Sequence, residues 1–216
     1  MEPEKQITSF LSNSPISIEQ NKEDKLSLFL SLLKQWSKKM NLVSYTDRRD
    51  VFIKHFIPSF WFYETIKTEK PQLILDIGTG AGFPGMIIKK LNPQIDVYLV
   101  ESNRKKTLFL REAAEQMDID PKIINNRIES FMTETNKTFD VIVSRAVTSL
   151  KEIWNWSNNL ITDNGSVFVI KGRDYKNELD QVDCADIQIS EIAPESKWVD
   201  SSPELNNKLI IKMEKA

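Results

Sequence analysis

Residues 73–85 read Leu-Ile-Leu-Asp-Ile-Gly-Thr-Gly-Ala-Gly-Phe-Pro-Gly, and this stretch decides the fold. Its continuous apolar run is typical of a buried parallel strand. The glycines at 78, 80 and 82 let the backbone turn tightly after the strand and approach a ligand closely. Proline is favoured in the first turn of a helix, so we expect a helix from Pro84 to Leu91 whose N-terminus faces the ligand.

The glycine loop matches two nucleotide-binding patterns. Gly80-x-Gly82-x-x-Gly85 fits a dinucleotide fingerprint, whereas Asp76-x-Gly78-x-Gly80-x-Gly82 fits the nucleoside loop of S-adenosylmethionine-dependent methyltransferases. A dinucleotide fingerprint begins where the strand ends, and in the frame that begins at Gly78 the third glycine is replaced by Phe83. We therefore favour the methyltransferase frame over the dinucleotide frame and over a turn without a ligand.

A second strand supports a nucleoside site. The run from Asp96 to Glu101 is strand-like and ends in an acid 25 positions after Asp76. A carboxylate at that place accepts hydrogen bonds from both ribose hydroxyls of a nucleoside. NAD and S-adenosylmethionine both carry this ribose, so Glu101 indicates the class of site without selecting the cofactor.

Composition limits the remaining possibilities. With 216 residues and 40% hydrophobic content, the chain can form one core and an accessory element. A single cysteine, Cys184, and a single histidine, His55, exclude a disulfide framework and a cysteine- or histidine-rich metal site, so we expect both side chains to be structural and no metal. No signal core and no run of about 18 apolar residues is found, which predicts a cytoplasmic protein without a membrane span. No apolar surface signal indicates an obligate dimer, so we expect a monomer.

Charge is segregated along the chain although the net charge is only −2. Six basic residues and two acids lie between Lys34 and Lys54, whereas eight acids and one lysine lie between Glu178 and Glu204. One face could therefore attract phosphates. A solvated helical face explains the basic stretch equally well.

The chain divides at Lys70-Pro71. Residues 1–70 contain no strand-like run and predict a helical extension, with an amphipathic helix at Lys25–Asn41. Asp47 is expected to cap a further helix, which Pro58 interrupts or restarts, and the aromatic residues between Phe52 and Phe62 are expected in the core.

Residues 71–216 predict a Rossmann-like domain with a seven-stranded, mostly parallel sheet and helices on both faces. Asn103 is expected to cap a helix that ends near Met117, and Asn164-Gly165 to form a turn before the fifth strand. After the first two strands, the expected strands are Lys122–Asn125, Phe139–Ser144, Ser166–Lys171, Ile187–Ile192 and Lys208–Met213, with a further helix at Leu150–Leu160.

The ligand of such a sheet lies at the carboxyl ends of the strands. This rule predicts a site made of residues 76–82, Glu101, 127–129, 144–146 and 171–173. Arg145 is the most informative member, because a strand that is apolar to its end then presents a guanidinium. The alternative is a surface arginine that pairs with a local acid.

The residues at the end of the fourth strand limit which methyl-transfer reactions are possible. Amino-group methyltransferases carry an Asp/Asn-Pro-Pro-aromatic tetrad there, and this chain has Ser144-Arg145-Ala146-Val147. Pyrimidine C5 methylation needs a cysteine nucleophile, but Cys184 lies beyond the fifth strand. An already nucleophilic atom remains, such as guanine N7, which needs no general base, so positioning and electrostatics carry the catalysis. Arginine suits the binding of guanine or its phosphate.

Several motifs in order give a specific resemblance. They are Asn41–Ser44, Lys54-His55 with Ser59, Gly78–Gly85, Arg127-Ile128-Glu129 and Ser144-Arg145-Ala146. Together they resemble the glucose-inhibited division protein B family from about Asn41 to Lys171, with a looser match to the C-terminus. The resemblance implies a class I S-adenosylmethionine-dependent methyltransferase with a helical N-terminal extension. It also implies N7 methylation of one guanine in the decoding region of 16S rRNA, as naked rRNA or in the small ribosomal subunit.

The resemblance also implies residue roles. By position, Gly78, Phe83, Ile128, Glu129 and Arg145 line the S-adenosylmethionine site, to which the residue patterns add Asp76, Gly80, Gly82 and Glu101. Catalytic and RNA-facing roles fall to Arg127, Arg145 and Lys171, with Arg173 beside them.

The chain departs from the family pattern at two places. Pro58 replaces an acid in the Lys54–Ser59 motif, and Asn207-Lys208 stands where the family has an arginine. A class I methyltransferase acting on another RNA or a small molecule and a nicotinamide-binding domain remain the alternatives.

Overall fold

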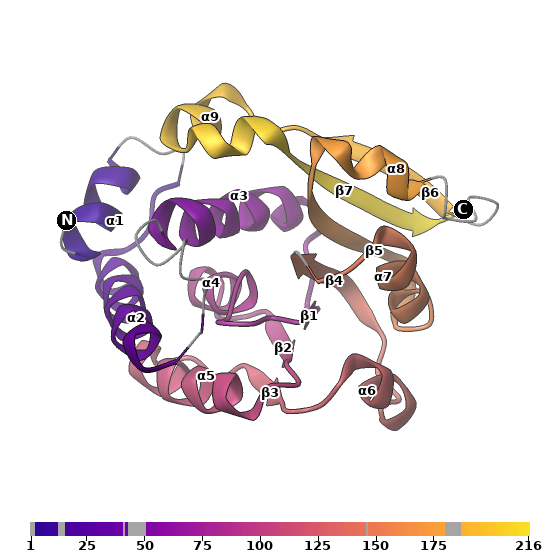
Figure 1. The fold of residues 1–216 in the computed structure, drawn as a ribbon, viewed down its shortest axis with the longest axis horizontal. Coiled ribbons are helices and arrows are strands. Elements are labelled where there is room, and N and C mark those ends of the chain that lie inside the picture. The colour runs from indigo at the N-terminus through magenta and orange to yellow at the C-terminus, as the bar shows by residue number, and fades with distance from the viewer. Residues whose placement is uncertain (1–2, 13–15, 41, 43–50, 146, 180–186) are drawn as a thin grey trace.

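A seven-stranded sheet in the order β3-β2-β1-β4-β5-β7-β6 forms the centre of the computed structural model (Figure 1). Strands β1 to β5 run parallel, β7 is antiparallel to β5, and β6 is antiparallel to β7. The strands are β1 (Leu73–Ile77), β2 (Asp96–Val100), β3 (Lys122–Ile124), β4 (Phe139–Arg145), β5 (Ile161–Gly172), β6 (Ile187–Ile192) and β7 (Lys208–Lys215). The predicted seven-stranded, mostly parallel sheet is confirmed.

The structure describes residues 3–12, 16–40, 42, 51–145, 147–179 and 187–216. The expectations for Asn41, 43–50 including Asp47, Ala146 and Cys184 fall outside these ranges. Over the described ranges, no helix has both the length and the apolar character needed to cross a membrane.

Helices cover both faces of the sheet and form the N-terminal extension (Figure 1). The extension contains α1 (Pro3–Leu11), α2 (Gln20–Lys39), the π-helix η1 (Phe52–Phe56), α3 (Ile57–Ile66) and the 3₁₀ turn η2 (Lys67–Glu69). The remaining helical elements are α4 (Gly85–Leu91), α5 (Arg104–Met117), α6 (Ile128–Glu134), α7 (Leu150–Ser157), η3 (Arg173–Tyr175), α8 (Lys176–Leu179), α9 (Ser196–Ser201) and η5 (Pro203–Asn207). As predicted, the Asn103 side chain caps α5 by accepting from the backbone of Lys105 and Lys106.

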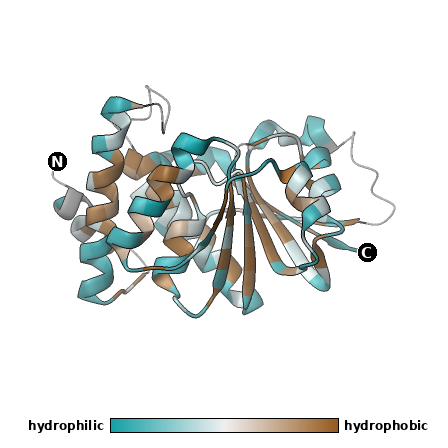
Figure 2. Cartoon of the chain, turned by 90° about the horizontal axis from the view of Figure 1, so that it is seen from below, coloured by the Kyte–Doolittle hydropathy of each residue, from teal (hydrophilic) through white to brown (hydrophobic). Residues whose placement is uncertain are grey.

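Alternation along the strands divides the core into two layers. In β4, Val141 and Val143 face a cluster formed with the extension, α4 and α5, whereas Ile142 faces a cluster formed with α6 and α7. Successive strand residues point to opposite faces, so a strand that is apolar throughout must be covered on both sides. Figure 2 shows these strands as an apolar centre between helices whose outer surfaces are hydrophilic.

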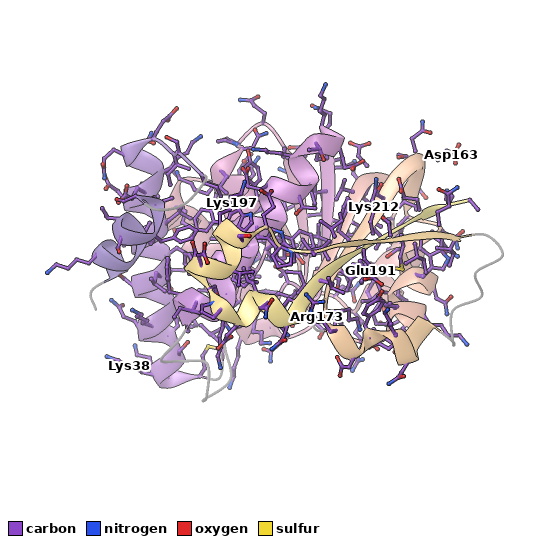
Figure 3. The ribbon with its side chains drawn as sticks, turned by 90° about the horizontal axis from the view of Figure 1, so that it is seen from above. Lys38, Asp163, Arg173, Glu191, Lys197 and Lys212 are labelled. Atoms are coloured by element: carbon purple, nitrogen blue, oxygen red, sulfur yellow. The ribbon has the colours of Figure 1, made fainter. Side chains whose placement is uncertain are left out.

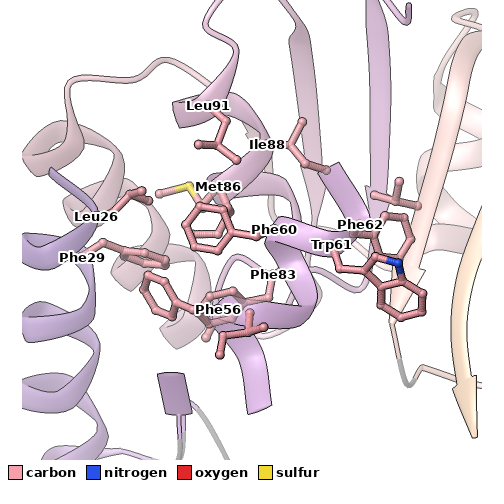
Figure 4. Close-up of a cluster of buried hydrophobic side chains, with 14 of the residues drawn as sticks. Leu26, Phe29, Phe56, Phe60, Trp61, Phe62, Phe83, Met86, Ile88 and Leu91 are labelled. Atoms are coloured by element: carbon pink, nitrogen blue, oxygen red, sulfur yellow. The ribbon is translucent and has the colours of Figure 1, made fainter. Parts of the chain in front are cut away.

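The extension shares one of these clusters with the sheet, as the close-up in Figure 4 shows. Phe29 of α2 contacts Phe56 of η1 and Phe83 of the glycine loop, each at 5.5 Å between ring centroids. The expectation that the aromatic residues between Phe52 and Phe62 belong to the core is therefore confirmed.

One turn prediction is wrong. Asn164-Gly165 was expected to form a turn before the fifth strand, but both residues lie within β5, which spans Ile161 to Gly172. The register with β4 shifts between Phe139 and Val141, which accommodates the extra residues. Glycine fits there because an added Cβ would lie 3.0 Å from the carbonyl oxygens of Phe139 and Asp140. Gly165 is therefore required by the close approach of β4 and β5, not by a turn.

The sequence order of the strands reverses at β1, which pairs with both β2 and β4. This reversal is the point at which open parallel sheets bind ligands, beyond the carboxyl ends of the strands. The glycine loop leaves β1 at this place, and the site is built from there.

A core substitution tests whether the extension and the sheet form one unit. Phe56→Ala removes a fully buried ring at their junction, and we expect a loss of about 3–5 kcal/mol in the free energy of unfolding. Urea denaturation followed by fluorescence and circular dichroism should give a single transition at a lower midpoint. Leu28→Ala, at a partly exposed position of α2, should change the free energy by about 0.5 kcal/mol or less. Two transitions, of which the Phe56 variant moves only one, would contradict a shared core.

Candidate active site at the carboxyl ends of the strands

The glycine loop has a conformation that side chains disfavour. Gly78, Gly80 and Gly82 have φ angles of 67°, 61° and 93°, in the left-handed region. An added Cβ at Gly78 would lie 2.6 Å from Val147 Cγ2, so space as well as backbone geometry requires glycine. The N–H groups of Gly78 and Thr79 donate to the carbonyl of Val100 at 2.9 and 3.2 Å, which fixes the loop against the end of β2.

Asp76 anchors the loop from behind. Its side chain is fully buried, and Oδ2 accepts hydrogen bonds from Thr79 Oγ1 at 2.7 Å and from the Gly85 N–H at 2.9 Å. Burial raises the pKa of the Asp76 carboxyl to about 6, against the opposing effects of these hydrogen bonds and of the Arg145 charge. Among the described residues, Oδ1 has no hydrogen-bond partner.

A cavity of about 270 Å³ opens beside the loop. Six of the predicted site residues line it, namely Ile77, Gly78, Glu101, Arg127, Ile128 and Glu129. The lining residues that the sequence did not predict are Val100, Ser102, Asn126, Val147 and Trp156. We call this space the first cavity.

The first cavity suits a nucleoside. The Glu101 carboxylate accepts from the Gly80 N–H at 3.0 Å through Oε2 and from the Asn103 N–H at 2.7 Å through Oε1. Each carboxylate oxygen keeps a second lone pair, so both can still accept ribose hydroxyls. Ile128 is buried and gives the cavity an apolar wall against which an adenine ring can pack.

Arg145 joins the end of β4 to the extension. Its Nη1 donates to the Lys54 carbonyl at 3.2 Å, its Nη2 contacts His55 Nδ1, and its guanidinium lies 5.4 Å from the centroid of the Phe83 ring. Pro58 has no N–H to donate to the carbonyl four residues earlier, which belongs to Lys54. The guanidinium therefore donates to a carbonyl that an ordinary helix would have occupied.

Pro58 acts as expected from the sequence. The π-helix η1 ends where α3 begins, and Pro58 stands in the first turn of α3. His55 packs on Phe83 at 5.4 Å between ring centroids and is half-buried. This surrounding agrees with the structural role expected for it, although His55 also borders a second space.

That second cavity, of about 340 Å³, lies between the extension and the start of β7. Its lining residues are Ile53, Lys54, His55, Pro58, Arg145, Ile170, Glu204, Leu205 and Lys208. Arg145 lines this cavity and not the first, whereas Val147, two residues later, lines the first. The end of β4 thus stands between the two spaces.

Other predicted site residues lie away from the first cavity. Asp76, Gly82 and Phe83 are absent from the lining of the first cavity, and an added Cβ at Gly82 would lie 2.4 Å from Met86 Cγ. Gly80 is absent from the lining of the first cavity, but its N–H binds Glu101, which is part of that lining.

The predicted catalytic Lys171 lies in a network of its own. Its ammonium donates to the Thr148 carbonyl at 2.6 Å and to both oxygens of Glu178 at 3.0 and 2.7 Å. Glu178 also accepts from the Leu150 N–H, so the network holds the segment that follows β4.

Arg127 and Arg173 are both exposed. Arg127 precedes α6 at the rim of the first cavity. Figure 3 labels Arg173 beside the segment that leads into β7, where its Nε donates to the Asn206 carbonyl at 2.8 Å. The described residues contain no group of three or more His, Cys, Asp and Glu side chains arranged to hold a metal.

The sheet order and the glycine loop define a class I S-adenosylmethionine-dependent methyltransferase. Solved structures share this fold at low identity. A methyltransferase from Geobacter sulfurreducens superimposes with a TM-score of 0.63 at 10% identity over 97% of each chain. The plantazolicin methyltransferase BpumL in complex with SAH gives 0.58 at 16% identity, over 91% of this chain and 99% of that one.

Sequence comparison gives the family. The family model "GidB: rRNA small subunit methyltransferase G" matches residues 22–200. The "Ribosomal RNA small subunit methyltransferase G" of Mycoplasma capricolum subsp. capricolum is 36% identical over 191 residues, which cover 85% of this chain and 82% of the relative. That of Clostridium tetani is 32% identical, over 81% of this chain and 74% of the relative. The chain therefore belongs to the rRNA small subunit methyltransferase G family, and its cofactor is S-adenosylmethionine.

The buried carboxyl of Asp76 predicts a pH dependence. Because its pKa is raised from 3.8 to about 6 in the folded state, its contribution to stability is greatest below pH 3.8 and is lost as the pH rises to 6. Asp76→Asn keeps an acceptor for Thr79 and Gly85 but cannot ionise. Between pH 4 and pH 7 the free energy of unfolding of the variant relative to wild type should therefore rise by about 2 kcal/mol.

Urea denaturation at pH 4, 5, 6 and 7 measures this difference. Asp96→Asn, at an exposed position of β2, supplies the background difference for the same chemical change. A difference between Asp76→Asn and wild type that does not vary with pH would show that the Asp76 carboxyl has an ordinary environment.

Proposed function

We propose that this chain transfers a methyl group from S-adenosylmethionine to N7 of a guanine in the decoding region of 16S rRNA, with the cofactor in the first cavity and the acceptor entering from the second. The observation that carries the proposal is the place of the two cavities at the end of β4. Arg145 and Val147, which line different cavities, are two residues apart, so their Cα atoms are separated by at most about 7 Å. A donor and an acceptor can therefore meet there.

The residues of the first cavity fit the cofactor. When bound, S-adenosylmethionine supplies an electrophilic methyl group on a sulfonium. Glu101 would accept the ribose hydroxyls and Ile128 would pack on the adenine, while Arg127 and Glu129 border the same space. Asp76 would act indirectly, because it holds the loop that carries Gly78 and Gly80.

The acceptor side needs charge and orientation but no base. Guanine N7 has a lone pair and no proton, so the chain only has to place it in line with the methyl group. Lys54, Arg145 and Lys208 line the second cavity, and Arg173 lies beside the start of β7, so a cluster of cations faces the RNA phosphates. Lys171 would be a positioning residue here, since its network fixes the segment that follows β4.

The helical extension of residues 1–70 supplies Lys54, His55 and Pro58 to the acceptor side, so we infer that it shapes RNA binding without forming a separate unit. The large apolar side chains exposed on the described surface do not form one patch: Ile53 lines the second cavity, Val147 lines the first, and Leu28 and Leu108 lie on α2 and α5. This distribution favours a monomer. We propose that the monomer acts on small ribosomal subunits in the cytoplasm.

Methyl transfer to small subunits and to 16S rRNA that lack the modification tests the function. Labelled S-adenosylmethionine reports incorporation, and aniline cleavage locates 7-methylguanine. We expect a single cleavage site with wild type and a loss of at least about 100-fold in rate with Arg145→Ala, because the junction that orients the acceptor is removed.

Two controls separate this effect from misfolding. Arg111→Ala, at an exposed position of α5, should keep full activity. S-adenosylhomocysteine should raise the melting temperature of wild type and of Arg145→Ala equally, since Arg145 does not line the first cavity. Incorporation without cleavage would move the methyl group to another atom, and no incorporation into rRNA would reject the proposed substrate.

A further inference from the structure

The second cavity combines an apolar lining with a carboxylate and cations. Ile53, Pro58, Ile170 and Leu205 provide apolar surface, and Glu204 is the acid among Lys54, Arg145 and Lys208. Apolar walls with a few charged groups are typical of a site that binds a flat polar ring. A nucleobase attached to a phosphate has this character.

Glu204 and Lys208 are available to a ligand. Over the described ranges of the chain, neither side chain makes a hydrogen bond or an ion pair, although both line the same cavity. Arg145, in contrast, is engaged with Lys54 and His55. A carboxylate that has no protein donor can accept from a ligand without breaking an internal contact.

The position of Glu204 fits the far edge of a guanine. Arg145 ends β4, and Lys208 begins β7 two strands away, because β5 lies between them. Two inter-strand spacings amount to about 10 Å, enough to hold a base edge-on between the end of β4 and η5. Guanine carries N7 and O6 on one edge, whereas N1–H and the exocyclic amine lie on the opposite side of the ring. With N7 directed to the end of β4, the two donors face η5.

We propose that the second cavity binds the target guanine and that Glu204 reads it by accepting hydrogen bonds from N1–H and from the exocyclic amine. This inference rests on the proposed function and adds the residue that selects the base. Adenine has no N1–H and carries its amine on the other edge, so it cannot make the same pair of bonds. Lys208, on the same rim, binds the phosphate of the target nucleotide.

The carboxylate also assists the reaction. The N7 lone pair forms the bond to the methyl carbon as the carbon–sulfur bond breaks, no proton is lost, and the purine gains one positive charge. That charge spreads over the ring and makes N1–H a stronger donor. The hydrogen bond to Glu204 is therefore stronger in the transition state than in the bound substrate, which is the condition for catalysis by binding.

Glu204→Gln tests the inference on small subunits that wild type methylates. The amide keeps the shape of the side chain but loses the charge and places a donor against the donors of guanine. We expect kcat/KM for 7-methylguanine formation to fall by about 10- to 100-fold, the range of one lost bidentate base contact. Glu195→Gln makes the same change at an exposed residue before α9 and should keep wild-type activity.

A second acceptor separates base reading from a structural effect. Subunits rebuilt with inosine at the target position keep N7, O6 and N1–H but lack the exocyclic amine. The kcat/KM of wild type should be about 10-fold lower on inosine than on guanine. For Glu204→Gln the two kcat/KM values should differ by no more than about 2-fold, because the carboxylate that binds the amine is gone.

The outcomes are distinct. If wild type forms no 7-methylguanine, the proposed function fails and the inference fails with it. If wild type forms it and Glu204→Gln matches wild type, or discriminates against inosine as strongly, the function stands and the role of Glu204 is rejected. Loss of the thermal shift with S-adenosylhomocysteine in Glu204→Gln would also reject it, because the residue would then act through the fold.

Discussion

The carboxylate of Asp76 is the constraint on which the site depends. It is fully buried at the end of β1, and its two hydrogen bonds connect the glycine loop at Thr79 to the start of α4 at Gly85. With a pKa raised to about 6, the ionised form costs about 3 kcal/mol at neutral pH. In return, the hydrogen bonds of Asp76 fix the glycine loop in its left-handed conformation, with Gly78 and Glu101 lining one cavity. Stability is thus reduced beside the cavity in which we propose that the cofactor binds.

The loop also connects the sheet to the extension. Phe83 follows the last loop glycine and packs on Phe29 and Phe56 of the extension, while the guanidinium of Arg145 lies against the same ring. The extension therefore contacts the loop and the end of β4 in one place.

The sequence predicted the parts of the site that follow from strand ends. Gly78 and Glu101 stand at the carboxyl ends of adjacent strands, so apolar runs followed by glycine or an acid were enough to find them. Trp156 was missed, because it lies on α7 and reaches the cavity only through the packing of that helix on the sheet. The sequence also did not indicate that the Lys171 ammonium forms an ion pair with Glu178, because only the fold reveals that contact.

Pro58 and Gly165 show how local signals acquire meaning from their surroundings. Pro58 is a departure from the family motif, and it lacks the N–H that an α-helix would direct at the Lys54 carbonyl, which accepts from Arg145 instead. Gly165 looked like a turn, yet it permits a close approach of two strands. In both cases the residue type shows which group is missing, an N–H at Pro58 or a Cβ at Gly165. The group that comes close because of it, the Arg145 guanidinium or the backbone of β4, is distant in the sequence.

The central claim is that the end of β4 separates a cofactor cavity from an acceptor cavity. A crystal structure of the chain with S-adenosylhomocysteine and guanosine monophosphate tests it most directly. We expect the ribose of the cofactor product on Glu101 in the first cavity, and the guanine in the second with N7 directed at the sulfur. A guanine bound elsewhere, or S-adenosylhomocysteine in the second cavity, would contradict it.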